Sequence, residues 1–216
     1  MAFACLPAGA RAQSSCPDVD STAAWARVLR AWQDETGDAW TNDSLRQVLL
    51  RLGQRDQAVR ADYGTRVGDT AFTRELLRQD SILSDSLSRI LDRFGLPTRA
   101  MVGSRGADAA MRIAQHSATL QPRVFALAQA LPPASISPEA LALLEDRVLV
   151  GQGRPQRFGS QFTAGSDGVF RFAPVDDPGG LEQRRAAAGL PPLALYVCMV
   201  EQSGIRIDRS TLPRPP

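Results

Sequence analysis

The chain contains no lysine and only one histidine, and both shortages restrict the chemistry open to it. All 25 basic residues are arginines, so the Gly-Lys-Ser/Thr phosphate loop of nucleotide-binding proteins is excluded. Any mechanism that needs an imidazole near neutral pH must use His116. One histidine with scattered cysteines gives no zinc-ligand spacing. We therefore predict no metal and no cofactor, although a metal site made of carboxylates alone stays open.

Long apolar segments and a strong charge of one sign are also missing. No apolar run approaches the roughly 20 residues that span a bilayer, which predicts a protein without a membrane span. The 23 acidic residues leave a net charge of only +2, so the charge balance does not indicate a nucleic-acid partner. Aromatic residues make up 6% of the chain and are sparse near the arginines. A surface that binds single-stranded nucleic acid combines aromatic and basic residues, so this pattern argues against such a function. The Gly-x-Ser-x-Gly nucleophile motif is absent as well.

The N-terminal segment resembles the end of a secretory signal peptide. It is rich in alanine and contains Ala10-Arg11-Ala12, a small-x-small cleavage pattern, but it lacks a positive start and a full apolar stretch. We therefore predict a secreted or periplasmic protein, and a cytoplasmic one if the segment is merely a flexible leader. Cleavage after Ala12 would remove Cys5 and leave Cys16 and Cys198, an even number that suits an oxidising compartment. A disulfide between these two cysteines and a pair of free thiols both stay open.

Apolar residues at spacings of three and four predict a mainly helical protein. The first helix follows a Ser21-Thr22 cap, and the second follows Asp43-Ser44. Gly103–Gly106 is predicted to be a loop. The segment after this loop is nearly apolar all round, which is typical of a buried helix. The predicted helices cover residues 23–35, 45–63, 71–94 with an interruption near Asp80, 107–118, 120–131, 137–147, 181–188 and 193–202.

Three short β-prone segments with turn residues between them predict a small antiparallel ribbon at residues 148–150, 157–162 and 169–172. The expected fold class is α+β, mainly helical: a helical array with a small antiparallel β ribbon near the C-terminal third. We expect a single domain over residues 21–205. A flexible leader at residues 1–20 would precede it, and a frayed, proline-rich tail at residues 206–216 would follow it.

Polar residues interrupt two of the predicted helices. Asp56 points toward the buried face of its helix, and Arg60 one turn later is a natural ion-pair partner. Gln115 and His116 lie within the nearly apolar helix. A lone buried histidine is more often a hydrogen-bonded core residue than a catalyst, and both interpretations of His116 stay open.

Further polar candidates lie in the C-terminal half. Asp146 is predicted in a last helical turn, where a carboxylate opposes the helix dipole. Arg147 is a possible local partner for this carboxylate. Alternatively, the two residues belong to a plain solvated charge cluster. The glycine-punctuated run Gly151–Gln161 builds a shaped loop whose glutamines and arginines supply hydrogen-bond donors without a nucleophile. Arg184 and Arg185 could bind a carboxylate or phosphate in bidentate fashion, although exposed arginine pairs are usually solvated.

Several motifs together resemble a bacterial family of unknown function over about residues 54–196. They are Asp56-Gln-x-x-Arg60, Gln115-His116, Asp146-Arg147, Pro155-Gln-x-Phe-Gly-Ser-Gln161 and Arg184-Arg185…Gly189-Leu190…Tyr196. The resemblance implies that these polar residues converge on one pocket, and it implies no reaction. This chain departs from the family at Phe158 and Ser160, where relatives have tyrosine and threonine, and at Ala118, where they usually have aspartate. The missing carboxylate counts against a catalytic His–Asp pair.

We predict that the Gln115-His116 pair faces the loop 156–161, with Asp56, Arg60 and Asp146 lining the same cavity. The leading interpretation is recognition of a small polar ligand or peptide, because glutamine and arginine recognise carboxylates and amides without reacting. One alternative is a hydrolase or lyase with His116 as general base, oriented by Asp146 or Asp56. Another is a structural or protein-interaction domain with a polar core. The oligomeric state stays open. The predicted ligand-binding residues are Asp56, Arg60, Gln115, Arg147, Gln156, Gln161, Arg184 and Arg185.

Overall fold

The structure is a computed structural model that describes residues 16–17, 20 and 22–213. The described residues form helices α1 (Ala24–Gln33), α2 (Asp43–Val59), α3 (Thr70–Phe94), α4 (Arg99–Gln115), α5 (Gln121–Gln129), α6 (Pro138–Gly151), α7 (Leu181–Ala187) and α8 (Leu193–Gln202). Their strands are β1 (Phe162–Ala164), β2 (Phe170–Phe172) and β3 (Ile207–Asp208). The predicted class, a mainly helical α+β protein with a small sheet near the C-terminal end, is confirmed.

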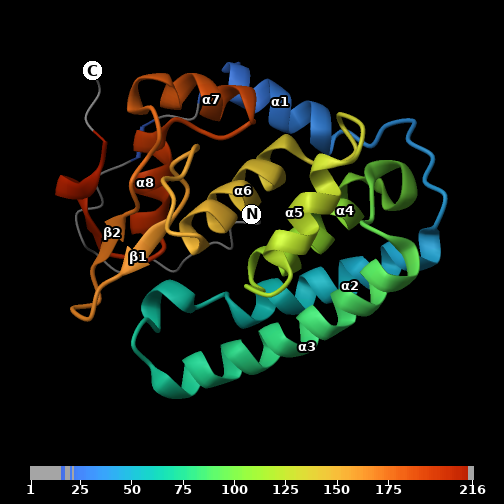
Figure 1. The fold of residues 1–216 in the computed structure, drawn as a ribbon, viewed down its shortest axis with the longest axis horizontal. Coiled ribbons are helices and arrows are strands. Elements are labelled where there is room, and N and C mark those ends of the chain that lie inside the picture. Colours follow the sequence, from blue (N-terminus) through green and yellow to red (C-terminus); the bar gives the residue numbers. More distant parts are fainter. Residues whose placement is uncertain (1–15, 18–19, 21, 214–216) are drawn as a thin grey trace.

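Helix α6 runs through the middle of the molecule (Figure 1). Helices α2 and α3 lie along one side of it, α1 and α7 lie along the opposite side, and α8 lies with the sheet at one end. Helix α4 contacts both α2 and α6, and therefore connects the α2–α3 pair to the centre of the fold.

Small residues let α4 approach its neighbours closely. A Cβ atom added at Gly53 of α2 would lie 2.9 Å from the Cβ of Ala109 in α4. The two helices therefore pack so closely at this point that a side chain larger than that of glycine would not fit at residue 53. Ala107, Ala110 and Ala114 are fully buried. The prediction of a buried helix after residue 106 is thus confirmed.

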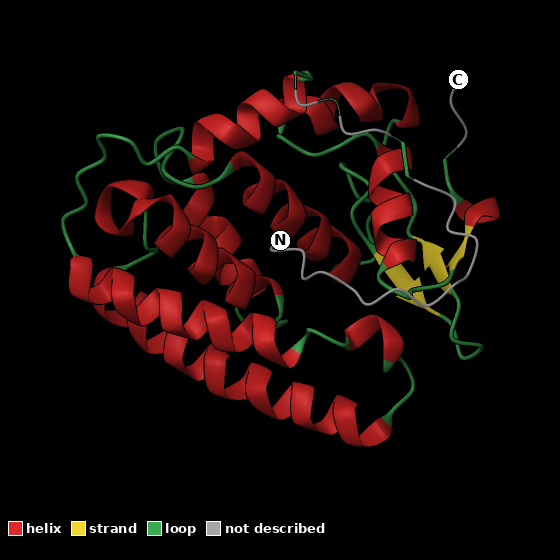
Figure 2. Cartoon of the chain, turned by 180° about the vertical axis from the view of Figure 1, so that it is seen from behind, coloured by secondary structure: helices red, strands yellow, loops and turns green. Residues whose placement is uncertain are grey.

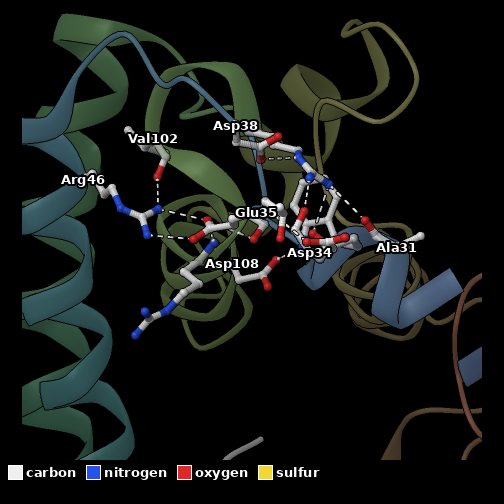
Figure 3. Close-up of polar contacts among 12 residues, drawn as sticks. Ala31, Asp34, Glu35, Asp38, Arg46, Val102 and Asp108 are labelled. Atoms are coloured by element: carbon white, nitrogen blue, oxygen red, sulfur yellow. Dashed lines mark hydrogen bonds and ion pairs between the residues drawn. The ribbon is translucent and has the colours of Figure 1, made fainter. Parts of the chain in front are cut away.

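The prediction of a loop at Gly103–Gly106 is wrong, because this segment lies inside α4. Only Gly103 departs from helical geometry, with a φ of 70°, and it kinks the helix. The Arg46 guanidinium occupies the space a side chain at Gly103 would need and donates to the Val102 carbonyl at 2.8 Å. Arg46 also forms a bidentate ion pair with Glu35 (Figure 3). Long-range contacts therefore stabilise a helix through a glycine-rich segment whose local sequence favours a loop.

The predicted ribbon is only partly correct. Residues 148–150 belong to α6 rather than to a strand, so Asp146 lies inside that helix and not in its last turn. Of residues 157–162, only Phe162 is in a strand. Strands β1 and β2 are antiparallel as predicted, while β3 adds a parallel edge that was not predicted. Residues 207–212, expected in a frayed tail, supply β3, a short 3-10 turn and Leu212, which packs against the core beneath the sheet.

Helix ends follow the sequence signals in some places. Ser137 caps α6 as predicted, since its hydroxyl accepts from the Ala140 amide at 3.3 Å. Helix α3 runs without interruption to its glycine C-cap, so the predicted break near Asp80 is wrong. The side chain of Asn42, and not Asp43-Ser44, caps α2. Helix α1 begins after Ala23 without a side-chain cap, and Ser21 lies outside the described residues.

A disulfide joins Cys16 to Cys198 of α8, with 5.6 Å between the Cα atoms. It ties Cys16 to α8, which lies with the sheet at one end of the molecule (Figure 2). Cys5 and the predicted cleavage pattern Ala10-Arg11-Ala12 lie outside the described residues. Among the helices described, none has the length and apolar character needed to cross a membrane.

Candidate functional site

Asp146 holds the loop 156–161 from inside α6. Its fully buried carboxylate accepts hydrogen bonds from the backbone amides of Arg157 (2.7 Å), Phe158 (3.0 Å) and Ser160 (3.0 Å). The Ser160 hydroxyl donates to it as well, at 2.9 Å. These donors satisfy the charge without a cation, so Asp146 fixes the shape of the loop.

Gln156 closes this loop on itself. Its buried side-chain amide donates to the carbonyls of Gln161 (3.1 Å) and Ala173 (2.8 Å) and accepts from the Gln161 amide at 2.8 Å. The Gln161 side chain donates to the Ser160 hydroxyl at 2.9 Å. Both glutamines predicted to bind ligand are therefore engaged within the loop.

The arginine pair of α7 also binds the loop. Arg185 is fully buried and donates to the carbonyls of Pro191 (2.8 Å), Phe158 (2.6 Å) and Gly159 (3.1 Å). Arg184 donates to the Arg157 carbonyl at 3.0 Å and pairs with the Asp177 carboxylate at 2.7 Å. The motif residues of the C-terminal half thus meet at this loop and bind mainly its backbone.

Arg60 is the predicted partner of Asp56, and the ion pair is confirmed at 2.8 Å. The second terminal nitrogen of Arg60 pairs with Asp80 of α3. The other Asp56 oxygen accepts from the Gln57 side chain at 2.8 Å. Burial raises the pKa of Asp56, which is fully buried, and the Arg60 charge opposes this rise. This network joins the end of α2 to the middle of α3.

Gln115 joins α4 to α6. Its side-chain amide is buried and donates to the Ala140 carbonyl in the first turn of α6, at 3.3 Å. The backbone carbonyl of Gln115 accepts from the side chain of Gln121 at 2.8 Å. Gln115 therefore fixes the position of the first turn of α6 against α4.

His116 lies at the C-terminal end of α4 and faces positive charge. Burial, followed by the charges of Arg60, Arg147 and Arg112, lowers the pKa of His116 to about 3. In the part of the chain that the structure describes, the imidazole makes no hydrogen bond to Asp146 or Asp56, the two carboxylates predicted to orient it. Both carboxylates are occupied by other donors.

Arg112 and Arg147 complete the surroundings of His116. Each has a buried Nε atom without an acceptor, and within the described ranges neither side chain makes a hydrogen bond or an ion pair. Burial lowers the pKa of Arg147. We call Arg60, Arg112 and Arg147 the arginine cluster. Sequence reasoning missed Arg112, although its position one turn before His116 on a buried helix could have indicated it.

The structure thus brings His116 near Arg60 and Arg147 of the predicted set and adds Arg112. Two surface cavities of the described chain involve none of the predicted residues. One, of about 400 Å³, lies between the end of α2 and the start of α3, and the other, of about 180 Å³, lies near Gly64 and Gly204. The predicted approach of His116 to the loop 156–161 stays a prediction.

The comparisons with known proteins identify a family but no activity. No curated protein and no solved structure matches the chain. A family model described as "family of unknown function (DUF6624)" matches residues 43–207, a range that includes the polar motifs from Asp56 to Tyr196. The chain therefore belongs to this family of unknown function.

Proposed function

We propose that this protein recognises a small anionic ligand, with a carboxylate or phosphate group, at Arg112 and Arg147 beside His116. The observation that carries the proposal is the pair of buried Nε atoms that find no acceptor. Every other candidate arginine from the sequence has partners: Arg60 binds two aspartates, and Arg184 and Arg185 bind loop carbonyls. Arg185 also has a buried Nη2 atom without a partner, but its other nitrogens bind carbonyls, whereas Arg112 and Arg147 make no side-chain hydrogen bond within the described residues.

The magnitude of the burial cost supports a ligand. Leaving a buried polar donor unsatisfied costs about 1–3 kcal/mol, and more for a charged group. His116 and Arg60 are the C-cap residues of α4 and α2, so the negative ends of two helix dipoles lie nearby. A helix dipole contributes only about 0.3–1 kcal/mol to a cation at its C-terminus. A bound anion would satisfy both guanidinium groups far better.

The chemistry of the site suits binding more than proton transfer. Two guanidinium groups provide planar sets of donors that match carboxylate and phosphate oxygens. A general base works best with a pKa near the operating pH, whereas the pKa of His116 is about 3. The hydrolase or lyase interpretation, with His116 and Asp146 as catalytic residues, is therefore the weaker one. In the binding interpretation, the neutral imidazole donates or accepts one hydrogen bond to the ligand.

The single histidine makes the test direct, because its NMR resonances can be assigned without ambiguity. We expect inorganic phosphate, acetate or citrate to perturb the His116 ring resonances at neutral pH and to raise the pKa of His116. Arg112→Gln and Arg147→Gln should each weaken binding by about tenfold or more. Arg51→Gln, at an exposed position on α2, is the matched control. If no anion perturbs His116, or if both variants bind as the wild type does, the proposal is wrong.

The proposal includes an exported location. The Cys16–Cys198 disulfide supports an oxidising compartment, where such bonds form and persist. An extracellular or periplasmic protein would meet its small ligand outside the cytoplasm. Detection of the protein in the culture medium or periplasm of its native host, with the disulfide formed, would test this location.

A further inference from the structure

The loop 156–161 is held by three helices. Besides Asp146 of α6 and the two arginines of α7, Tyr196 of α8 binds it, because the Tyr196 hydroxyl donates to the Ser160 carbonyl at 2.9 Å. The guanidinium carbon of Arg185 lies 5.0 Å from the centroid of the Tyr196 ring, a cation–π distance, so α7 and α8 meet at the loop. The order of the loop therefore depends on where α7 and α8 lie.

The N-terminal part of the chain is attached to both of these helices. Helix α1 lies beside α7 (Figure 1). A Cβ atom added at Gly189, just after α7, would lie 3.1 Å from a methyl carbon of Val28 and 3.4 Å from the Leu29 amide nitrogen. The disulfide attaches Cys16 to Cys198 of α8. Cys16 and α1 together, which we call the strap, therefore connect α7 to α8.

The C-terminal end of α1 is fixed by polar contacts. The Trp32 indole donates to Asp108 of α4 at 2.9 Å, and the Arg99 side chain donates to the Trp32 carbonyl at 3.0 Å. Glu35, just after the helix, forms the bidentate ion pair with Arg46 of α2 (Figure 3). We therefore expect this end of α1 to stay attached to the core without the disulfide.

The N-terminal end of α1 is held less firmly. The helix begins without a side-chain cap, and in its first two turns only Ala26 is buried. Among the described residues, the first turn, Ala24–Arg27, makes no side-chain hydrogen bond to another helix. Helix α1 has 10 residues, and isolated helices shorter than about 12–15 residues are marginal in water. This end of the strap therefore depends on the disulfide.

We propose that the strap is redox-sensitive: the Cys16–Cys198 bond keeps α1 on α7 and thereby orders the loop 156–161. In the dithiol form, the N-terminal end of α1 separates from Gly189, while its C-terminal end stays attached and the core stays folded. The loop is then ordered only after the chain has met an oxidising environment. This inference goes beyond the proposed function and does not depend on anion binding.

The bond forms by exchange with a disulfide oxidant, as happens in an oxidising compartment. One cysteine thiolate attacks the oxidant and displaces one of its thiolates, and the second cysteine attacks the resulting mixed disulfide and displaces the other. The two cysteines lose two protons and two electrons, and the disulfide of the oxidant becomes two thiols. A thiol reductant reverses both steps. Cys16 is partly exposed and Cys198 is buried, so the reductant attacks the sulfur of Cys16.

The tryptophans make the strap observable, because all three, Trp25, Trp32 and Trp40, lie in α1 or shortly after it. We expect dithiothreitol to shift their emission to longer wavelength and to increase their quenching by acrylamide. Far-UV circular dichroism should retain most of the helical signal. Cys16→Ser/Cys198→Ser should give the same spectra as the reduced protein and should not respond to dithiothreitol.

Hydrogen exchange tests the effect on the loop. Reduction should accelerate exchange of the Arg157, Phe158 and Ser160 amides by at least about tenfold, and exchange of the α3 amides by less than about threefold. Leu83→Ala, which opens a cavity beside the buried face of α3 and keeps the disulfide, is the control for a general loss of stability. In this variant the loop should not be accelerated selectively.

A second variant tests the contact between α1 and α7 with the disulfide intact. Val28→Asp places a charge where α1 meets Gly189, and it should accelerate exchange of the loop amides as reduction does. Ala24→Asp, at an exposed position on the same helix, is its control and should leave the loop unchanged.

Several outcomes would overturn the inference. They are equal acceleration of the loop and α3 amides on reduction, no acceleration of the loop, an unchanged tryptophan signal, and complete unfolding in dithiothreitol. Unchanged loop exchange in Val28→Asp would show that α1 does not transmit the effect. None of these results bears on anion binding at Arg112 and Arg147, so the two proposals fail separately.

Discussion

Burial of a charged side chain has opposite consequences at Asp146 and Arg147, two adjacent residues of α6. The carboxylate of Asp146 is surrounded by backbone amides and a hydroxyl, so its charge is compensated inside the fold. The guanidinium of Arg147 has a buried Nε atom without an acceptor. The first residue therefore stabilises a loop, and the second offers donors to a ligand. From the sequence alone, the two adjacent residues belong to one motif, and their different roles become visible only in the structure.

At the residue scale, we predict that His116 makes the protein sensitive to acid. The pKa of His116 is lowered to about 3 in the folded protein, against about 6.5 when unfolded. Below about pH 6.5 the unfolded chain binds a proton at His116, whereas the folded protein does not do so until the pH nears 3. The folded protein is therefore fully stable with respect to this group above pH 6.5 and loses stability progressively as the pH falls toward 3. The free energy of unfolding should decrease with a slope of up to about 1.4 kcal/mol per pH unit from this group. Urea unfolding of wild type and His116→Gln between pH 7 and 4.5 measures the difference.

The comparison of the two proteins isolates His116 from the carboxylates. The raised pKa values of Asp56, Asp108 and Glu139 act in the opposite direction, and both proteins share them. Glu35, whose pKa is lowered to about 2, matters only below about pH 4.5. If the stability curves of the two proteins run parallel over this range, His116 titrates normally and is not enclosed by positive charge.

At the element scale, the loop 156–161 depends on α6 and α7 rather than on strand pairing. We predict that Asp146→Asn lowers the free energy of unfolding by about 3 kcal/mol or more, because hydrogen bonds to a charged group contribute about 1.5–3 kcal/mol each. Hydrogen exchange of the amides of Arg157, Phe158 and Ser160 should accelerate. Mass spectrometry of peptides that cover this loop, together with urea unfolding, would measure both effects.

Glu145→Gln is the matched control for this prediction. Glu145 lies next to Asp146 and pairs with the side chain of Arg157 on the same loop, at 2.9 Å. Surface ion pairs contribute about 0–1 kcal/mol, so this change should have little effect on stability or exchange. Similar effects of the two substitutions would contradict the anchoring role of Asp146.

The elements show which sequence signals are reliable. Helix α8 has the predicted ends, and α3 ends at its glycine, because strong apolar spacing and local caps act within the element itself. Two of the errors lie at Gly103–Gly106 and at residues 148–150, where contacts from distant residues or the continuation of a buried helix override local preference. Strand β3 has two residues, too few to give an alternating pattern.

At the scale of the whole molecule, we predict a large effect of the disulfide on stability. Cys16 and Cys198 close a loop with a sequence separation of 182. In the chain-entropy model, such a loop stabilises the folded protein by up to about 5 kcal/mol. Addition of a reductant should therefore lower the melting temperature clearly, and Cys16→Ser/Cys198→Ser should melt at the same lower temperature. The variant itself should not respond to reductant. Two reactive thiols in the native, unreduced protein would contradict the prediction.

The sequence by itself determined the class of fold, most helices, the Asp56–Arg60 pair and the restriction of imidazole chemistry to His116. These features depend on periodicity, composition and neighbours within one or two turns, which local sequence records directly. Only the tertiary structure separated the motif residues into two groups, those that hold the loop 156–161 and those around His116. It alone added Arg112 to the candidate site. Whether a buried charge has a partner depends on residues far away in the chain, because the packing of α2, α4, α6 and α7 decides which donors and acceptors meet.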